Sequence, residues 1–244
     1  MVHRVYCEDL SGSHAEIEEA EAHHLLHVLR IKSGEQIQLF DGAGNSATAQ
    51  ITELTRRSLT AEIVARQSEV PRQQARIIVA VAPPKGDRLR WMIEKLTEIG
   101  VDQIVLLQTA RTIVTPGETK VDKLRANIIA ACKQSGRNRL MDVQPLIRLN
   151  DFLRSDVAQP QSARLYLAHP LDPFSTQSAT DPNSTAPSTN DSILFVGPEG
   201  GFTDNEVELL RERSAQTLSW PATILRIETA AIVFASLLIS KRSL

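Results

Sequence analysis

The sequence has few cysteines and few aromatic residues, and it has no long hydrophobic run. Two cysteines in 244 residues cannot form a disulfide scaffold or a four-cysteine zinc site. Aromatic residues, at 4% of the chain, are too few for a platform on which several nucleic-acid bases stack. No segment approaches the roughly 18 apolar residues of a membrane-spanning helix, and the N-terminal residues lack the apolar core of a signal peptide. We therefore expect a cytoplasmic protein with no membrane partner.

The sequence also lacks the motifs of several common enzyme classes. It contains no P-loop pattern G-x-x-x-x-G-K-[ST], no hydrolase pattern G-x-S-x-G and no metalloprotease pattern H-E-x-x-H. Gly42 to Ala47 match the dinucleotide pattern G-x-G-x-x-A, but alternating residues follow, so a hairpin turn explains these glycines better. His23 and His27 are four residues apart on an expected helix, yet no third ligand follows at a recognised spacing, and we expect no metal.

The net charge is small, but the charges are unevenly distributed. A formal net charge of −2 at pH 7 argues, taken alone, against a nucleic-acid partner. Residues 71–150, however, contain 14 Lys and Arg against 7 Asp and Glu, whereas the segments on either side are acidic. The basic segment predicts a surface that contacts phosphates; the alternative is a set of solvated helix faces.

Hydrophobic periodicity divides the chain near residue 70. Residues 1–70 contain several short segments with a period near two, together with one helix at about 20–31, which predicts a compact β-barrel. Residues 71–244 alternate short apolar strands with amphipathic helices, which predicts a parallel α/β sheet. Within them, residues 172–191 are mostly Ser, Thr, Pro, Asn and Asp. This composition predicts a mobile insert, either a neutral insertion or a functional lid.

The strongest local signal is the stretch from Ile193 to Glu206, ILFVGPEGGFTDNE. A buried strand runs into a glycine-rich loop, and Thr203 and Glu206 form a capping-box pattern that starts the next helix. Such a unit at a sheet edge predicts a ligand site, although a tight structural connection would have the same sequence. Because the loop has no lysine, a ligand with hydrogen-bonding edges fits it better than a polyphosphate.

A second signal is the segment Leu225–Ala231, LRIETAA, which opens a helix that is apolar nearly all round. Such a helix is buried in a core or in an oligomer interface. Arg226 and Glu228 flank its start, where they either pair with each other or act in a site. Further polar and cationic groups stand at the ends of expected elements in the KGDR segment, at Arg111 and in the QSGR segment.

Together these segments resemble the ribosomal small-subunit (16S) RNA uracil-N3 methyltransferases of the SPOUT class. The matching stretches, in the family's order, are HHLLHVLR, KGDRLRWMIEKLTEIGV, RTIV at Arg111, QSGR, FVGPEGGFTDNE and LRIETAA. The chain departs from the family's pattern at Ala130, Lys133 and Gln134, in a run that is often acidic in the family. It also has Trp220 and its successors where a glycine-containing turn is usual.

The resemblance implies a fold and an activity. The fold is a SPOUT α/β knot, a deep trefoil knot, over residues 71–244, with an N-terminal PUA-like β-barrel over residues 1–70. The activity is transfer of a methyl group from S-adenosyl-L-methionine to N3 of a uridine in 16S rRNA, on the assembled 30S subunit, by a homodimer. Alternatives are methylation of a ribose 2′-oxygen or of guanine by another SPOUT enzyme, or a non-catalytic RNA-binding protein of ribosome assembly.

The resemblance also implies site residues. Arg226 would stabilise charge that develops on the uracil, and Glu199 or Glu228 would act as the base. The implied cofactor-binding residues are Leu167, His169, Val196, Gly197, Pro198, Glu199, Gly200, Gly201, Leu218, Trp220, Ile224, Leu225, Arg226, Glu228, Thr229 and Ala230. The candidate RNA-binding residues, chosen for contact with phosphates, are Arg4, His24, Arg30, Lys85, Arg88, Arg111, Arg137 and Arg139.

Overall fold

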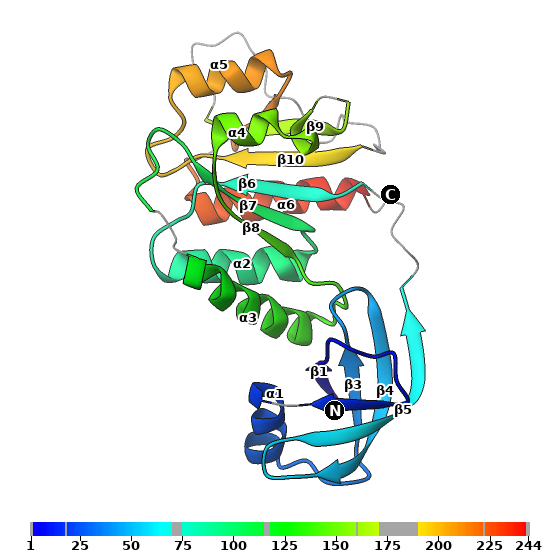
Figure 1. The fold of residues 1–244 in the computed structure, drawn as a ribbon. Coiled ribbons are helices and arrows are strands. Elements are labelled where there is room, and N and C mark those ends of the chain that lie inside the picture. The colour runs from blue at the N-terminus through cyan, green and yellow to red at the C-terminus, as the bar shows by residue number, and fades with distance from the viewer. Residues whose placement is uncertain are drawn as a thin grey trace. The chain divides into compact units, whose positions relative to one another are not determined.

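A computed structural model of the chain describes residues 2–17, 19–69, 75–114, 118–159, 161–170, 190–221 and 223–242. The chain divides into two compact units, Met1–Arg72 with Ile129–Leu140, and Gln73–Ile128 with Met141–Leu244 (Figure 1). Most of the expected mobile insert at 172–191 lies outside the described residues; its last residue, Asp191, begins a strand. Among the described residues, no helix is long and apolar enough to cross a membrane.

The first unit is built on a five-stranded sheet in the order β1-β3-β4-β5-β2. β1 pairs in parallel with β3, and the remaining neighbours are antiparallel. Side chains alternate between buried and exposed along β2, as expected for a sheet with one face on a core. The strands are β1 (His3–Tyr6), β2 (His14–Ile17), β3 (Gln36–Phe40), β4 (Asn45–Leu54) and β5 (Leu59–Ser68).

The helix expected at 20–31 differs from a regular α-helix. The segment α1 (Glu19–His23) continues as a π-helical turn, η1 (His24–Leu29), which buries Leu25 in the core of the first unit. It ends at Arg30, whose backbone is left-handed with φ 53°, so that Ile31 N donates to Leu25 O at 3.1 Å. A wider turn of this kind is not visible in a hydrophobic pattern, because the apolar residues still recur at helical spacing.

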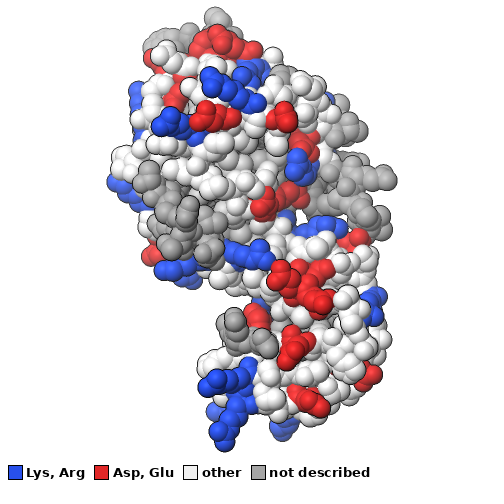
Figure 2. All heavy atoms as spheres, viewed as in Figure 1, with Lys and Arg blue, Asp and Glu red and all other residues white. Residues whose placement is uncertain are grey.

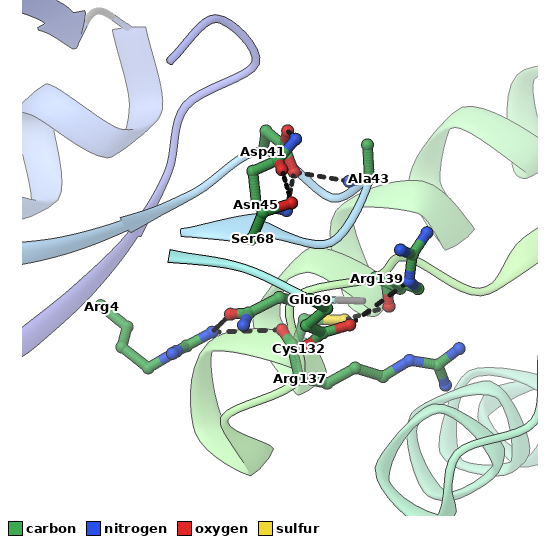
Figure 3. Close-up of polar contacts among 10 residues, drawn as sticks. Arg4, Asp41, Ala43, Asn45, Ser68, Glu69, Cys132, Arg137 and Arg139 are labelled. Carbon is green, nitrogen blue, oxygen red and sulfur yellow. Dashed lines mark hydrogen bonds and ion pairs between the residues drawn. The ribbon is translucent and has the colours of Figure 1, made fainter. Parts of the chain in front are cut away.

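Residues 129–140 pack with the first unit, whereas the sequence predicted a single boundary near residue 70. Arg4 Nη2 donates to Asn138 Oδ1 at 2.7 Å and to Arg137 O at 3.2 Å, and Arg139 Nε lies 3.3 Å from Glu69 Oε2 (Figure 3). Gly44 N donates to Asn138 O at 3.1 Å. Gly44 adopts φ +108°, a backbone conformation that side chains rarely allow, so the β3–β4 hairpin favours glycine there.

The second unit is built on a six-stranded, wholly parallel sheet in the order β11-β9-β10-β6-β7-β8, as the alternation of strands and helices predicted. Sequence patterns missed β11, because its three residues are too few to show a period. The strands are β6 (Ile77–Val81), β7 (Gln103–Gln108), β8 (Asp142–Arg148), β9 (Ala163–Ala168), β10 (Asp191–Val196) and β11 (Gln216–Leu218).

Helices cover both faces of the parallel sheet, which explains why every residue of β6 is buried. α4 and α5 share a core with the strands that includes Phe152, Phe195 and Leu210, whereas α6 packs against α2, β6, β9 and β10. The helices are α2 (Asp87–Ile99), α3 (Glu118–Ser135), α4 (Leu149–Arg154), the 3-10 turn η2 (Asp156–Ala158), α5 (Asp204–Glu212) and α6 (Ile227–Arg242).

Candidate functional site

The residues that the resemblance assigned to a cofactor belong to three loops, 167–170 after β9, 196–201 after β10 and about 218–230 after β11, which leave the same edge of the parallel sheet. β11, β9, β10 and β6 are consecutive neighbours, so their carboxyl ends lie together. His169 N donates to Leu218 O at 3.1 Å, which joins the loops after β9 and β11. Ala82 N donates to Val196 O at 3.0 Å, which joins the ends of β6 and β10. The sheet therefore brings together segments that lie far apart in the sequence.

The glycine-rich loop after β10 is shaped by the ring of Phe202, which is buried in the core. A Cβ on Gly197 would lie 2.9 Å from Phe202 Cδ2 and 3.1 Å from its backbone nitrogen. Gly201 adopts φ +70° and donates its N–H to Pro198 O at 2.8 Å, which closes a tight turn. At Gly200 a Cβ would meet only the Arg111 side chain, at 3.3 Å.

The predicted capping box at the start of α5 is confirmed, and it also anchors a neighbouring loop. Thr203 Oγ1 accepts from Glu206 N at 3.3 Å, and Glu206 Oε2 accepts from Thr203 N at 2.8 Å. Glu206 Oε1 accepts from Ala110 N at 2.8 Å, and Arg111 Nη1 donates to Gly200 O at 2.6 Å. The segment after β7 thus holds the glycine-rich loop, a role that sequence reasoning missed because the contact joins residues about 90 positions apart.

Arg88, in the first turn of α2, lies between the two carboxylates proposed as a base. Its Nη2 is 2.7 Å from Glu199 Oε1, and its Nη1 is 4.0 Å from Glu228 Oε1. The Glu199 side chain is 54% exposed and the Glu228 side chain 8% exposed. Glu228 Oε2 is buried without a hydrogen-bond partner among the described residues. Arg88, a candidate for RNA contact, is therefore part of the candidate cofactor site.

The remaining residues implied for the cofactor lie along these loops with varied exposure. Arg226 is exposed, and in the described part of the chain it forms no ion pair with Glu228, so the pairing considered from sequence is replaced by the contact of Glu228 with Arg88. Burial, reinforced by Arg211, lowers the pKa of His169, while Asp204 opposes this shift. Leu167, Val196, Leu218 and Ala230 are buried, Leu225 and Thr229 are half-buried, and Trp220 and Ile224 are exposed.

Several candidate RNA-binding arginines have partners within the chain. Arg4 and Arg139 bond within the first unit, and Arg111 holds the Gly200 carbonyl. His24, Arg30 and Lys85 are exposed. On the face shown in Figure 2, Lys and Arg are interspersed with Asp and Glu. Among the described residues, no group of three or more His, Cys, Asp or Glu could hold a metal, although the His23 and His27 rings lie 4.7 Å apart.

Comparison with known proteins identifies the class to which this fold and these loops belong. An RNA methyltransferase domain family matches residues 71–239, and an RNA methyltransferase PUA domain family matches residues 17–64. The chain is 31% identical over 223 residues to the Ribosomal RNA small subunit methyltransferase E of Bacillus subtilis, which covers 87% of this chain and 84% of that protein.

Solved structures agree over the whole length. A probable rRNA-methyltransferase from Porphyromonas gingivalis has a TM-score of 0.87 at 27% identity, covering 99% of each chain. A Ribosomal RNA small subunit methyltransferase E from Neisseria gonorrhoeae, bound to S-adenosyl methionine, has a TM-score of 0.85 at 27% identity, covering 98% of each chain. The fold and loops thus define an RNA methyltransferase. The chain belongs to the family of the ribosomal RNA small subunit methyltransferase E proteins.

The close approach of Phe202 to Gly197 allows a test of whether this contact shapes the glycine-rich loop. We expect Gly197→Ala to lower the free energy of unfolding by about 1–3 kcal/mol, because the new methyl group must displace the Phe202 ring or its backbone. Gly200→Ala is the matched control, since its methyl group meets only a flexible side chain. Urea denaturation measures both. Equal unfolding free energies for the two variants would show that contact with Phe202 does not shape the loop.

Proposed function

We propose that the protein uses S-adenosyl-L-methionine to methylate N3 of a uridine in 16S rRNA, on the 30S subunit in the cytoplasm. The observation that carries this proposal is the convergence of the three loops after β9, β10 and β11 at one sheet edge. Membership of the family supports it, since its relatives are named for methylation of small-subunit rRNA and one solved relative contains the cofactor.

The residues at this edge fit the proposed cofactor. S-adenosyl-L-methionine has a neutral adenine with hydrogen-bonding edges and a cationic sulfonium and ammonium, and when bound it supplies an electrophilic methyl group. The lysine-free glycine loop allows close backbone approach. Glu199 in the loop and Glu228 beside it supply negative charge, which suits the cationic sulfonium and ammonium of this cofactor. The cofactor-binding residues are those of the three loops named above.

The chain's own residues would handle the proton and the charge of the uracil. N3 faces the pairing edge and carries a proton at neutral pH, so the base must be extruded and the proton accepted. Arg226 is exposed at the entry to α6, where its charge would stabilise a uracil carbonyl oxygen as negative charge develops. Arg88 neutralises Glu199 at 2.7 Å, whereas Glu228 keeps an unused acceptor, which favours Glu228 over Glu199 as the base.

We also infer the finer architecture that the resemblance implies. A deep trefoil knot in the second unit is supported by β10 lying between β6 and β9 and by α6 packing back against all three strands. A PUA-like barrel is supported by the curled sheet of the first unit and by the PUA domain match. A homodimer is supported by Trp91, 47% exposed on α2, and by the half-buried residues Ile232, Val233 and Leu237 on α6.

The function is tested by the methylated product. The protein is incubated with the methyl-labelled cofactor and either 30S particles or naked 16S rRNA, and the RNA is digested to nucleosides for mass spectrometry. We expect 3-methyluridine, with more product from 30S particles. A 2′-O-methylated nucleoside or a methylguanosine would contradict the assigned atom. Binding of RNA without any methylated product would contradict catalysis.

Arg226 provides a second test. We expect Arg226→Ala to lower kcat by about 10²–10³-fold while the dissociation constant of the cofactor changes little, because its contact forms with charge in the transition state. Single-turnover assays and calorimetry measure the two quantities. Arg154→Ala is the control, since Arg154 is an arginine with a 77% exposed side chain outside the loops. Equal losses of turnover and cofactor affinity would instead make Arg226 a residue that shapes the cofactor loop.

A further inference from the structure

The first unit contains a pocket that the proposed methyl transfer does not use. It is an open pocket with a volume of about 280 Å³, lined by β1, the π-helical turn η1 and the second half of α3. All of its lining residues belong to Met1–Arg72 or Ile129–Leu140, which form one compact unit. The volume lies just below the range for small-ligand sites, roughly 300–1,000 Å³, so the pocket suits a ligand no larger than one nucleotide.

The lining of this pocket combines an apolar surface with cationic and hydrogen-bonding groups. Leu25 and Leu29 supply the apolar part from η1. Arg4, Lys133 and His24 supply the polar part, and none of the lining residues is Asp or Glu. An aliphatic surface beside cationic groups matches a nucleobase joined to a phosphate, with hydrophobic contact taking the place of aromatic stacking in this chain, where aromatic residues are scarce.

Arg4 is already positioned for this role by the chain. Its Nη2 is held by Asn138 Oδ1 at 2.7 Å and by Arg137 O at 3.2 Å, and its guanidinium carbon lies 5.0 Å from the centre of the Phe40 ring. Its Nε is buried without a hydrogen-bond partner among the described residues. Both carbonyl-type partners are neutral, so they orient the guanidinium and leave its positive charge available to an anion.

Lys133 differs from Arg4, because it already forms an ion pair with a carboxylate of the same unit. Its Nζ lies 2.8–2.9 Å from both oxygens of Glu21, on α1, and each side chain is 23% exposed. Both side chains keep part of their surface in contact with solvent, so water screens the pair in part and a phosphate can exchange with the carboxylate. Glu21 is therefore an internal competitor for the cation that the pocket would offer to RNA.

We propose that this pocket binds one unpaired nucleotide of the RNA substrate, with the base against Leu25 and Leu29 and a phosphate at Arg4 and Lys133. The inference rests on the proposed function, in that RNA is the substrate, but it assigns a contact distant in sequence from the three cofactor loops. The π-helical turn contributes to it, since such turns occur frequently at functional sites.

The pocket is tested by filling it. Ala130 lines the pocket and is exposed on α3, so Ala130→Trp can occupy the space without disturbing a core. Ala126→Trp is the matched control, because Ala126 is also exposed on α3 and does not line the pocket. With labelled 16S rRNA as the probe in filter binding, we expect Ala130→Trp to raise Kd about tenfold and Ala126→Trp to leave it within about twofold.

Further readouts separate this inference from the proposed function. Calorimetry with S-adenosyl-L-methionine is expected to give unchanged cofactor affinity for both tryptophan variants, and circular dichroism the wild-type spectrum. Equal RNA affinities for Ala130→Trp and Ala126→Trp would overturn the pocket while leaving methyl transfer intact. An equal effect of Ala130→Trp on a fully paired RNA duplex would overturn the assignment to an unpaired nucleotide. Failure of the wild-type protein to bind 16S rRNA would overturn both proposals.

Removing the Glu21 carboxylate, which competes for Lys133, gives an independent test in which RNA affinity is expected to rise and not to fall. We expect Glu21→Gln to lower Kd for 16S rRNA about threefold. It is also expected to steepen the slope of log K against log salt by about 0.7–0.9, as for one additional phosphate contact. Glu16→Gln is the control, because it makes the same change of net charge at an exposed position on β2. Identical effects of Glu21→Gln and Glu16→Gln would show that Lys133 does not contact phosphate.

Discussion

The parallel pairing of β10 between β6 and β9 determines where the candidate cofactor site lies. Strands that run in one direction end at one edge, so the loops after β9, β10 and β11 cannot be separated without breaking the sheet. The bonds from His169 to Leu218 and from Ala82 to Val196 are consequences of that order. The glycine loop is then held by Phe202, which is close in sequence, and by Arg111 from the loop after β7, which Glu206 anchors in turn. The site is therefore a property of strand order as much as of any motif.

Arg88 lies at this edge of the sheet and contacts two carboxylates that differ in exposure. Glu228 is a buried carboxylate, and removing a charged group from water costs free energy unless a charge of opposite sign lies nearby. Arg88 reduces that cost at 4.0 Å, although it lies closer to the more exposed Glu199 at 2.7 Å. The ion pair between Arg88 and Glu199 is partly exposed to solvent, so it contributes little to stability. It can therefore rearrange when a ligand enters. Arg88 is thus better described as a residue that positions carboxylates than as a free phosphate contact.

Local patterns predicted most elements and the most specific loop, but not the partners of individual side chains. The capping box at Thr203, the helix end at Gly100 and the apolar strand β6 each follow from residues close in sequence. The contacts of Arg88 and Arg111 depend on which strands become neighbours, and no local pattern contains that information. The same limit applies to α3, a continuous helix whose second half packs with residues 1–72. Its amphipathic pattern gives no sign of that change of partner.

The first half of α3 belongs to the second unit and its end belongs to the first unit. This division bears on the uneven distribution of charge along the chain. Residues 1–70 are acidic, whereas residues 129–140 contain Lys133, Arg137 and Arg139 and no acidic residue. Glu21 pairs with Lys133 near the end of α3, and Glu69 pairs with Arg139 in the segment after the helix, so these basic residues compensate carboxylates of the acidic unit. The basic segment identified in the sequence is therefore divided between the two units and does not form a single surface. Because pairs near the surface are weak, the part assigned to the first unit can both stabilise that unit and exchange its carboxylates for phosphates.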